Sequence, residues 1–178
     1  YADHHYAGEI PSHALLSTLI NLSPEVSTSA LINGHLKWQR AGWAIVGCYG
    51  DNLDSTAGKI ANTLGAPGDL SRWKELGVLI NYNGYGASID DLHFAPADLY
   101  ARLLPHNNPQ HCLDNDPDLI QTLSAAYGDD MRQAEMAPRI VEEGALSVVA
   151  FPDAPWARRV SGVYGNFLAN NVPDRAHA

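Results

Sequence analysis

The sequence is poor in cysteine and in basic residues. Its two cysteines, Cys48 and Cys112, lie far apart and show no Cys-x-x-Cys spacing, which argues against a structural zinc site. Lysine and arginine total 11 against 20 acidic residues, so the net charge is -9. Because nucleic-acid-binding surfaces are usually basic, this balance argues against a long polyanion as the partner and favours a small or short substrate.

Long apolar stretches are absent as well. No apolar run approaches the roughly 20 residues of a transmembrane helix, and no charged-then-apolar leader opens the chain at Tyr1. We therefore expect no membrane partner, and the cysteine usage favours a reducing, cytoplasmic setting. With 46% apolar residues the chain can build a core. Nothing in the sequence indicates an oligomeric state.

The densest chemistry lies at the start, where Asp3, His4 and His5 follow one another. Neighbouring side chains diverge on a helix and alternate faces on a strand. Two adjacent histidines therefore converge most easily where a strand gives way to a loop, and Gly8 and Pro11 predict such a loop. Imidazole and carboxylate suit divalent ions such as Mn, Fe, Co and Zn. The alternative is an exposed, polar stretch without a ligand.

A second acidic position follows the short apolar run of residues 43–50, which we predict to be a buried helix. Asp51 comes directly after this run, where the backbone turns and can present a carboxylate to a site. Asp54 is a suitable N-cap for the next predicted helix, residues 53–64, which leaves Asp51 free for another task. The alternative is that Asp51 is itself a cap.

Taken together, Asp3-His4-His5 and the apolar run that ends in Asp51 resemble the DHH family of phosphoesterases. The resemblance implies phosphoester hydrolysis at two divalent ions, Mn foremost, with Mg or Co as alternatives. By position, His4 and Asp51 would bind metal, and His5 would face the substrate phosphate as a catalytic and substrate-binding residue. Asp3 would act with them by orienting His4, since a ligating imidazole usually donates its other N–H to a carboxylate.

In that family two further motifs, one of Asp-x-Asp type, precede Asp-His-His, and this sequence contains neither. We therefore expect an internal fragment of a longer protein that is nearly inactive by itself. The resemblance divides the chain into a DHH-like domain over residues 1–104, a helical linker over 105–145, and the start of a DHHA1-like substrate-binding domain over 146–178. The glycine-rich motif of that second domain is missing.

Periodicity and punctuation predict the remaining elements. Helices are expected over residues 24–38 with Ser23 or Ser27 as the cap, and over 70–82, 96–104, 116–143 and 156–170, with a strand over 146–151. Thr28 and Ser29 lie at a helix start and either bind phosphate or simply cap. Tyr82 and Tyr85 either stack on a base or sugar, or pack at a helix end.

Other polar residues are interpreted as surface. Asp90, Asp91 and His93 are expected on a surface loop, and Arg158 and Arg159 are expected only to solvate their helix. An apolar face near Leu19, Ile45 and Val46 is expected to be exposed where upstream strands of the family would cover it, which would favour self-association.

The fold class that follows is α/β, with a truncated parallel sheet, a helical linker and the start of a second α/β domain. The predicted function is hydrolysis of phosphodiester or phosphoanhydride bonds in nucleic-acid ends, short oligonucleotides, dinucleotides or small phosphate esters. The alternative is a non-catalytic ligand-sensing or assembly domain on the same scaffold. An Asp-x-Asp motif upstream in the open reading frame would distinguish the two.

Overall fold

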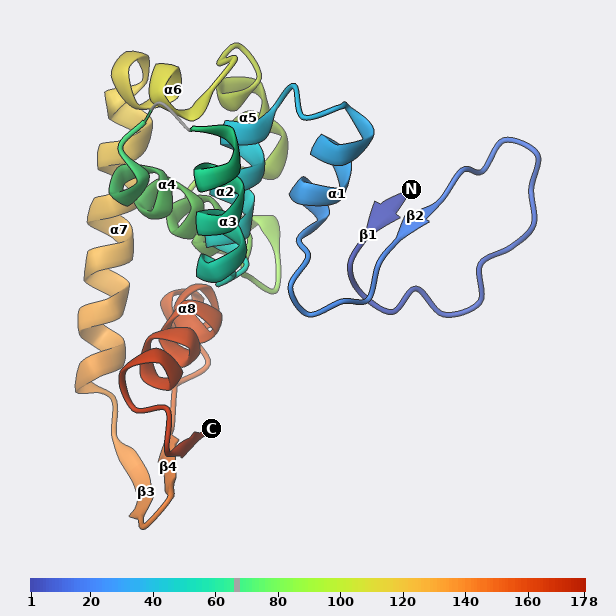
Figure 1. Ribbon diagram of the computed structural model, residues 1–178. Coiled ribbons are helices and arrows are strands. Elements are labelled where there is room, and N and C mark those ends of the chain that lie inside the picture. Colours follow the sequence, from blue (N-terminus) through green and yellow to red (C-terminus); the bar gives the residue numbers. More distant parts are fainter. Residues whose placement is uncertain (66–67) are drawn as a thin grey trace. The chain divides into compact units, whose positions relative to one another are not determined.

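The computed structural model describes residues 1–65 and 68–178 and shows a mixed α and β chain (Figure 1). At this level the predicted fold class is confirmed. The described helices are α1 (Thr28–His35), α2 (Ala41–Gly50), α3 (Asp54–Leu64), α4 (Leu70–Tyr82), the 3-10 helix η1 (Ile89–Asp91), α5 (Pro96–Leu103), α6 (Pro109–Asn115), α7 (Pro117–Met136) and α8 (Pro155–Asn171). No helix within the described residues combines the length and the apolar character needed to span a bilayer.

The chain divides into two compact units, and α4 runs from one into the other. The first unit contains residues 1–77 and 106–115, and the second contains residues 78–105 and 116–178. Each unit is therefore built from two separate stretches of the sequence. The predicted boundaries at 104/105 and 145/146 refer to domains of the resembled family, and they stay predictions.

The core of the first unit is α2, whose run of small and apolar residues buries almost every side chain. Ile45 and Cys48 are fully buried and Val46 is 2% exposed. Gly47 lets α1 approach, because a Cβ at this position would collide with the Ser29 side chain. The expected exposed face is therefore wrong for Ile45 and Val46, because α2 packs against α1 and α3, whereas Leu19 is 38% exposed.

Two very short strands precede these helices. Strands β1 (Ala2–Asp3) and β2 (Leu19–Ile20) pair in parallel, with Ala2 opposite Leu19. A long loop joins them and extends away from α1 (Figure 1). Helix α1 begins later than predicted, at Thr28, where the Ser27 hydroxyl caps it by accepting the Ala30 N–H at 3.2 Å.

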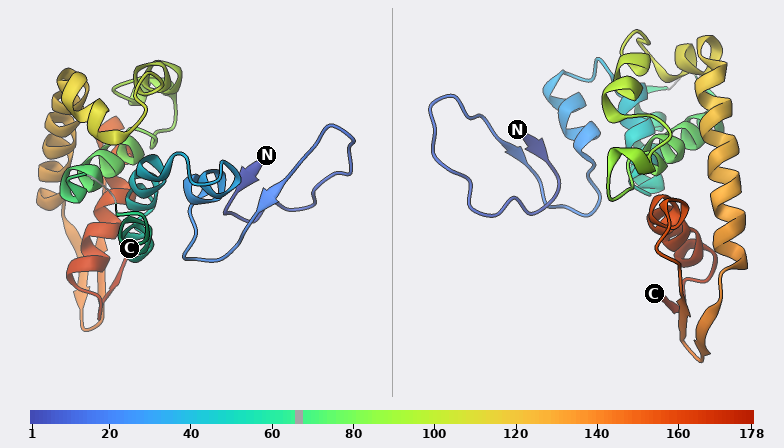
Figure 2. Two further views of the ribbon diagram at one scale, coloured as in Figure 1. Left: turned by 45° about the horizontal axis from the view of Figure 1, so that its top comes forward. Right: turned by 180° about the vertical axis from the view of Figure 1, so that it is seen from behind.

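In the second unit α8 packs along α7, as the two further views also show (Figure 2). Their shared core consists of buried residues from both helices and the end of α4: Tyr82, Met131, Ala134, Val160, Val163, Tyr164 and Leu168. A three-stranded sheet lies beyond, in the order β3 (Arg139–Glu143), β4 (Leu146–Val149), β5 (Ala176–His177).

The predicted helix over residues 116–143 is too long. Helix α7 ends at Met136, and residues 139–143 form strand β3, antiparallel to β4. Pro138 cannot donate a helical hydrogen bond, and the β-branched pair Ile140 and Val141 favours a strand. Gly144 then makes the turn with a left-handed φ of 50°, a conformation that glycine adopts without steric cost.

Candidate metal centre

The candidate centre begins where β1 ends, at Asp3. One oxygen of its carboxylate, Oδ1, accepts the backbone N–H of His4 at 2.7 Å and that of His5 at 3.1 Å. These bonds fold the chain back on itself, as an aspartate does when it mimics a backbone turn. The fold-back brings two consecutive imidazole rings to one side, at the strand-to-loop transition where the sequence predicts it.

The two rings face each other through their Nε2 atoms, which lie 3.1 Å apart. Ligand atoms of Asp3, His4 and His5 all lie within 4.8 Å of one another. An ion about 2.1 Å from both nitrogens would subtend an angle of about 95° over the 3.1 Å separation. This angle is close to that between neighbouring ligands of an octahedral ion, so the rings can share one ion without a large rearrangement.

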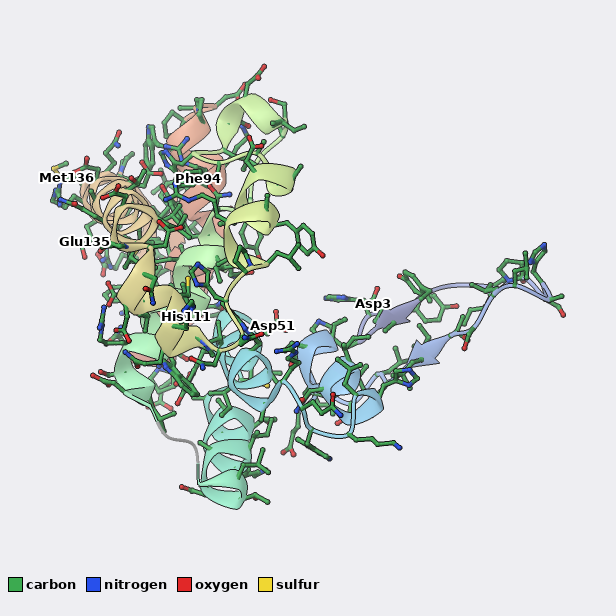
Figure 3. The ribbon with its side chains drawn as sticks, turned by 90° about the horizontal axis from the view of Figure 1, so that it is seen from above. Asp3, Asp51, Phe94, His111, Glu135 and Met136 are labelled. Atoms are coloured by element: carbon green, nitrogen blue, oxygen red, sulfur yellow. The ribbon has the colours of Figure 1, made fainter. Side chains whose placement is uncertain are left out.

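Asp51 joins this cluster from a distant part of the sequence. It is the C-cap residue of α2, and its Oδ2 lies 3.7 Å from Nδ1 of His4. Figure 3 shows Asp3 at the N-terminal strand and Asp51 at the end of its helix, both in the first unit. The structure therefore groups Asp3, His4 and His5 within ligand distance of one another and brings Asp51 to the Nδ1 side of His4.

The contacts of Asp3 differ from the expected ones. Its Oδ1 lies 2.9 Å from Nδ1 of His5, whereas the expectation was that Asp3 would orient the ring of His4. Nδ1 of His4 instead accepts the backbone N–H of Thr28, the first residue of α1, at 3.1 Å. The sequence predicts Thr28 at a helix start, but nothing in it indicates that the free N–H of Thr28 would donate to a histidine.

These bonds assign the protons on both rings. Since His4 Nδ1 accepts from Thr28, a neutral His4 carries its proton on Nε2 and donates it to Nε2 of His5. His5 then donates from Nδ1 to Asp3. The Nε2 lone pair of His5 is thus backed by a carboxylate, the arrangement found behind metal-bound histidines. Binding of an ion through Nε2 of His4 would place the ring's proton on Nδ1, where the bond from Thr28 would be lost and Asp51 Oδ2, 3.7 Å away, could accept the proton instead.

The two carboxylates have different electrostatic surroundings. Burial raises the pKa of Asp51, and the nearby rings of His4 and His5 partly offset this. The Tyr1 hydroxyl, which donates to Asp3 Oδ2 at 2.6 Å, together with His5 lowers the pKa of Asp3 well below its usual range. Within the described residues, neither carboxylate forms an ion pair with lysine or arginine, so a bound cation would meet negative charge that no protein cation neutralises.

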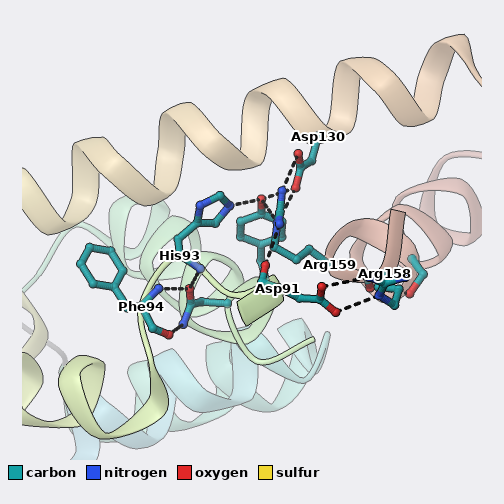
Figure 4. Close-up of polar contacts among 9 residues, drawn as sticks. Asp91, His93, Phe94, Asp130, Arg158 and Arg159 are labelled. Carbon is teal, nitrogen blue, oxygen red and sulfur yellow. Dashed lines mark hydrogen bonds and ion pairs between the residues drawn. The ribbon is translucent and has the colours of Figure 1, made fainter. Parts of the chain in front are cut away.

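The second group of polar residues from the sequence, in the other unit, has a different character. Asp91 is 5% exposed and accepts two hydrogen bonds from Arg158, at 2.8 and 2.9 Å. Asp130 likewise accepts from Arg159 at 2.8 and 3.1 Å. Figure 4 shows both pairs. The predicted surface positions of Asp91, Arg158 and Arg159 are therefore wrong, because these residues link η1, α7 and α8.

Of the tyrosines of this region, Tyr82 is packed in the core, whereas Tyr85 is 40% exposed. Tyr82 is fully buried, its hydroxyl donates to Asp130, and His93 Nε2 lies 3.0 Å from that hydroxyl. Tyr85 lies against Gly162, where an added Cβ would approach the tyrosine ring to 2.9 Å. The structure therefore supports packing at a helix end for Tyr82, and for Tyr85 both interpretations stay predictions.

Comparison of the chain with protein-family models, with curated proteins and with solved structures finds no significant match in any of the three. Function is therefore inferred from the geometry of Asp3, His4, His5 and Asp51.

Proposed function

We propose that Asp3, His4, His5 and Asp51 contribute to a divalent-metal centre that hydrolyses phosphoester bonds. The observation that carries the proposal is the 3.7 Å approach of Asp51 Oδ2 to His4 Nδ1. A resemblance based on two separate motifs requires them to meet in space, and these residues are 47 positions apart. Their meeting supports a shared site for His4 and Asp51, the two residues that the DHH resemblance pairs.

The donor set fits the implied metal. It combines imidazole nitrogen with carboxylate oxygen, which suits Mn²⁺ and Co²⁺, and the oxygen ligands also suit Mg²⁺. When bound, such ions activate water and stabilise the oxygens of a phosphoryl group. His4 would hold the ion through Nε2, Asp51 would accept a proton from Nδ1 of the same ring, and Asp3 would keep the ring of His5 oriented. The ring of His5, whose side chain is 75% exposed, would share the ion through Nε2 and lie on the side open to a substrate phosphate.

The substrates proposed are phosphodiesters or phosphoanhydrides of modest size, such as nucleic-acid ends, short oligonucleotides, dinucleotides or small phosphate esters. The net charge of -9 supports a short substrate over a long polyanion. A cytoplasmic setting belongs to the same proposal.

Two measurements test the proposal. Mn²⁺ binding is followed by electron paramagnetic resonance in the wild type, His4→Gln and Asp51→Asn. Hydrolysis of bis(4-nitrophenyl) phosphate is assayed for the chain and for the product of its whole open reading frame. We expect both variants to lose Mn²⁺ affinity and to lose hydrolysis wherever the wild type shows it.

The controls separate the alternatives. Asp54→Asn, close in sequence to Asp51 and paired with Lys74, should bind Mn²⁺ as the wild type does. Mn²⁺ binding that depends on His4 and Asp51, without hydrolysis by either product, would refute the hydrolase and favour a metal-dependent sensing domain. Unchanged Mn²⁺ binding in both variants would remove these residues from any metal centre.

A further inference from the structure

A second pair of histidines, His106 and His111, lies in the first unit outside the cluster at Asp3. Their Nδ1 atoms face each other at 2.8 Å, and the ring centroids are 5.0 Å apart. His106 is half-buried and His111 is exposed, so solvent can reach the pair. The alternative to a site is a single hydrogen bond, in which one Nδ1 donates a shared proton to the other.

The backbone around both rings is firmly held. The indole N–H of Trp43 donates to the carbonyl oxygen of His106 at 3.0 Å, and Arg40 donates to the carbonyl of Asn107 at 3.3 Å. The N–H of His111 donates to the side chain of Asn108 at 2.8 Å, at the start of α6. These bonds use the backbone and not the rings, so the two imidazoles are positioned without being occupied by them.

We propose that His106 and His111 form a second divalent-metal site that selects ions favouring nitrogen ligands, such as Ni²⁺, Cu²⁺ or Zn²⁺. An ion about 2.0–2.1 Å from each nitrogen would subtend about 85–90° over the 2.8 Å separation. This is the angle between neighbouring ligands in octahedral and square-planar centres. The ion would replace the shared proton, which would pass through solvent to Nε2 of the ring that carried it, and water would complete the coordination.

The ligand types distinguish this site from the first. The cluster at Asp3 offers carboxylate oxygens and suits Mn²⁺, whereas the pair His106 and His111 offers two nitrogens and no carboxylate. Affinity for such a nitrogen pair rises from Mn²⁺ through Ni²⁺ to Cu²⁺. Mn²⁺ should therefore bind at the cluster at Asp3 and not at the pair, whereas Ni²⁺ and Cu²⁺ can bind at both.

The first test is a calorimetric titration with Ni²⁺ in a His4→Ala, His5→Ala background, which silences the cluster at Asp3. We expect one equivalent to bind, and His106→Gln or His111→Gln in this background to weaken Ni²⁺ at least about tenfold, since a second tethered ligand raises the effective concentration. The matched control is His35→Gln, an exposed histidine at the end of α1, which should leave the affinity unchanged. Equal Ni²⁺ affinity in all three variants would overturn the proposal.

The second test needs no variant and so does not depend on the background folding. Cu²⁺ is added to the wild-type chain, from substoichiometric amounts upward, and the imidazole resonances are followed by nuclear magnetic resonance. We expect the signals of His106 and His111 to broaden together at the same Cu²⁺ concentration, while Mn²⁺ leaves them sharp. Broadening of one ring without the other, or of neither once Cu²⁺ exceeds two equivalents, would show that the pair does not chelate.

Discussion

The cluster at Asp3 in the first unit and the cluster at Asp91 and Asp130 in the second unit both contain aspartates, but these aspartates have different partners. In the second unit, Asp91 and Asp130 are neutralised by Arg158 and Arg159, which are fixed in place by packing of α8. At the N-terminal cluster, Asp3 is held by a tyrosine hydroxyl, two backbone N–H groups and an imidazole. The aspartates of the second unit are thus paired with arginines, whereas among the described residues no lysine or arginine pairs with an aspartate of the cluster at Asp3.

This difference indicates which carboxylates can bind a metal ion. A carboxylate that already has two hydrogen bonds from a guanidinium gains little from another cation, and removing its partner leaves a buried charge. A carboxylate supported by neutral donors keeps its charge available. Polar density alone therefore does not identify a site, because the nature of the partner decides whether the group is structural or open to a ligand.

The largest effect on stability is expected from Asp130→Asn. Asp130 and Arg159 are nearly buried, with side chains 5% and 12% exposed, and removing one partner of such a pair typically costs about 3–5 kcal/mol. Urea unfolding should show this loss. The matched control is the neighbouring Asp129→Asn, whose pairing with Arg132 is exposed and typically contributes about 0–1 kcal/mol. Similar losses in the two variants would contradict the buried-pair interpretation.

Asp51→Asn should give the opposite pattern, with Mn²⁺ affinity reduced at least about tenfold and no loss of stability. Because burial raises the pKa of Asp51, its charged form opposes folding above the usual carboxyl range, and the neutral amide removes that term. Electron paramagnetic resonance and urea unfolding measure the two quantities. Asp91→Asn, from the other cluster, should lose stability and keep Mn²⁺. A loss of stability in Asp51→Asn would contradict the expected difference between Asp51 and Asp91.

His93→Gln should flatten the pH dependence of unfolding. Burial, and then the charge of Arg159, lowers the pKa of His93 below its usual 6.5. The unfolded chain therefore binds this proton first as pH falls, so stability is full above pH 6.5 and declines below it. Unfolding free energies at pH 7.5, 6.5 and 5.5 measure the slope. An identical slope in the variant would show that His93 does not contribute.

The smallest effect is expected at Asp54. The sequence predicts it as an N-cap, but the cap position belongs to Leu53 and no side chain caps α3. Asp54 lies in the first turn and pairs with Lys74 at 2.5 Å, both side chains nearly half exposed. Asp54→Ala should therefore cost about 0.3–1 kcal/mol through the helix dipole and the exposed pair. A thermal melt that shows several times this loss would indicate a role beyond these two contacts.

Local chemistry explains what the sequence predicts well. Helix α4 spans Leu70–Tyr82 as expected, because Asp69 accepts the N–H groups of Ser71 and Arg72 at its start. Asp51 follows α2 at the predicted position, and the fold-back at Asp3 brings His4 and His5 together. Each of these depends on contacts within a few residues, which propensity and capping rules describe.

The partners of charged residues could not be predicted in the same way. Asp91 and Arg158 are 67 positions apart, and nothing local distinguishes an arginine that is exposed from one that meets a buried carboxylate. The packing of α8 against η1 decides it. The hairpin of β3 and β4 was different, since Pro138 and Gly144 signal it in the sequence and the helical pattern before them masked it.

Asn83 shows a last consequence, for the chemical lifetime of the chain. Its buried side chain accepts from the N–H groups of His93 and Phe94 and donates to the Phe94 carbonyl. Asparagine before glycine is prone to deamidation, because the next backbone nitrogen attacks the side-chain amide with little hindrance. Here the N–H of Gly84 is bonded to the Asn81 carbonyl at 2.9 Å, so neither reacting group is free to move. Deamidation of Asn83 should therefore begin in molecules in which this region has unfolded locally. Loss of the side-chain N–H donor would then hinder refolding of the region.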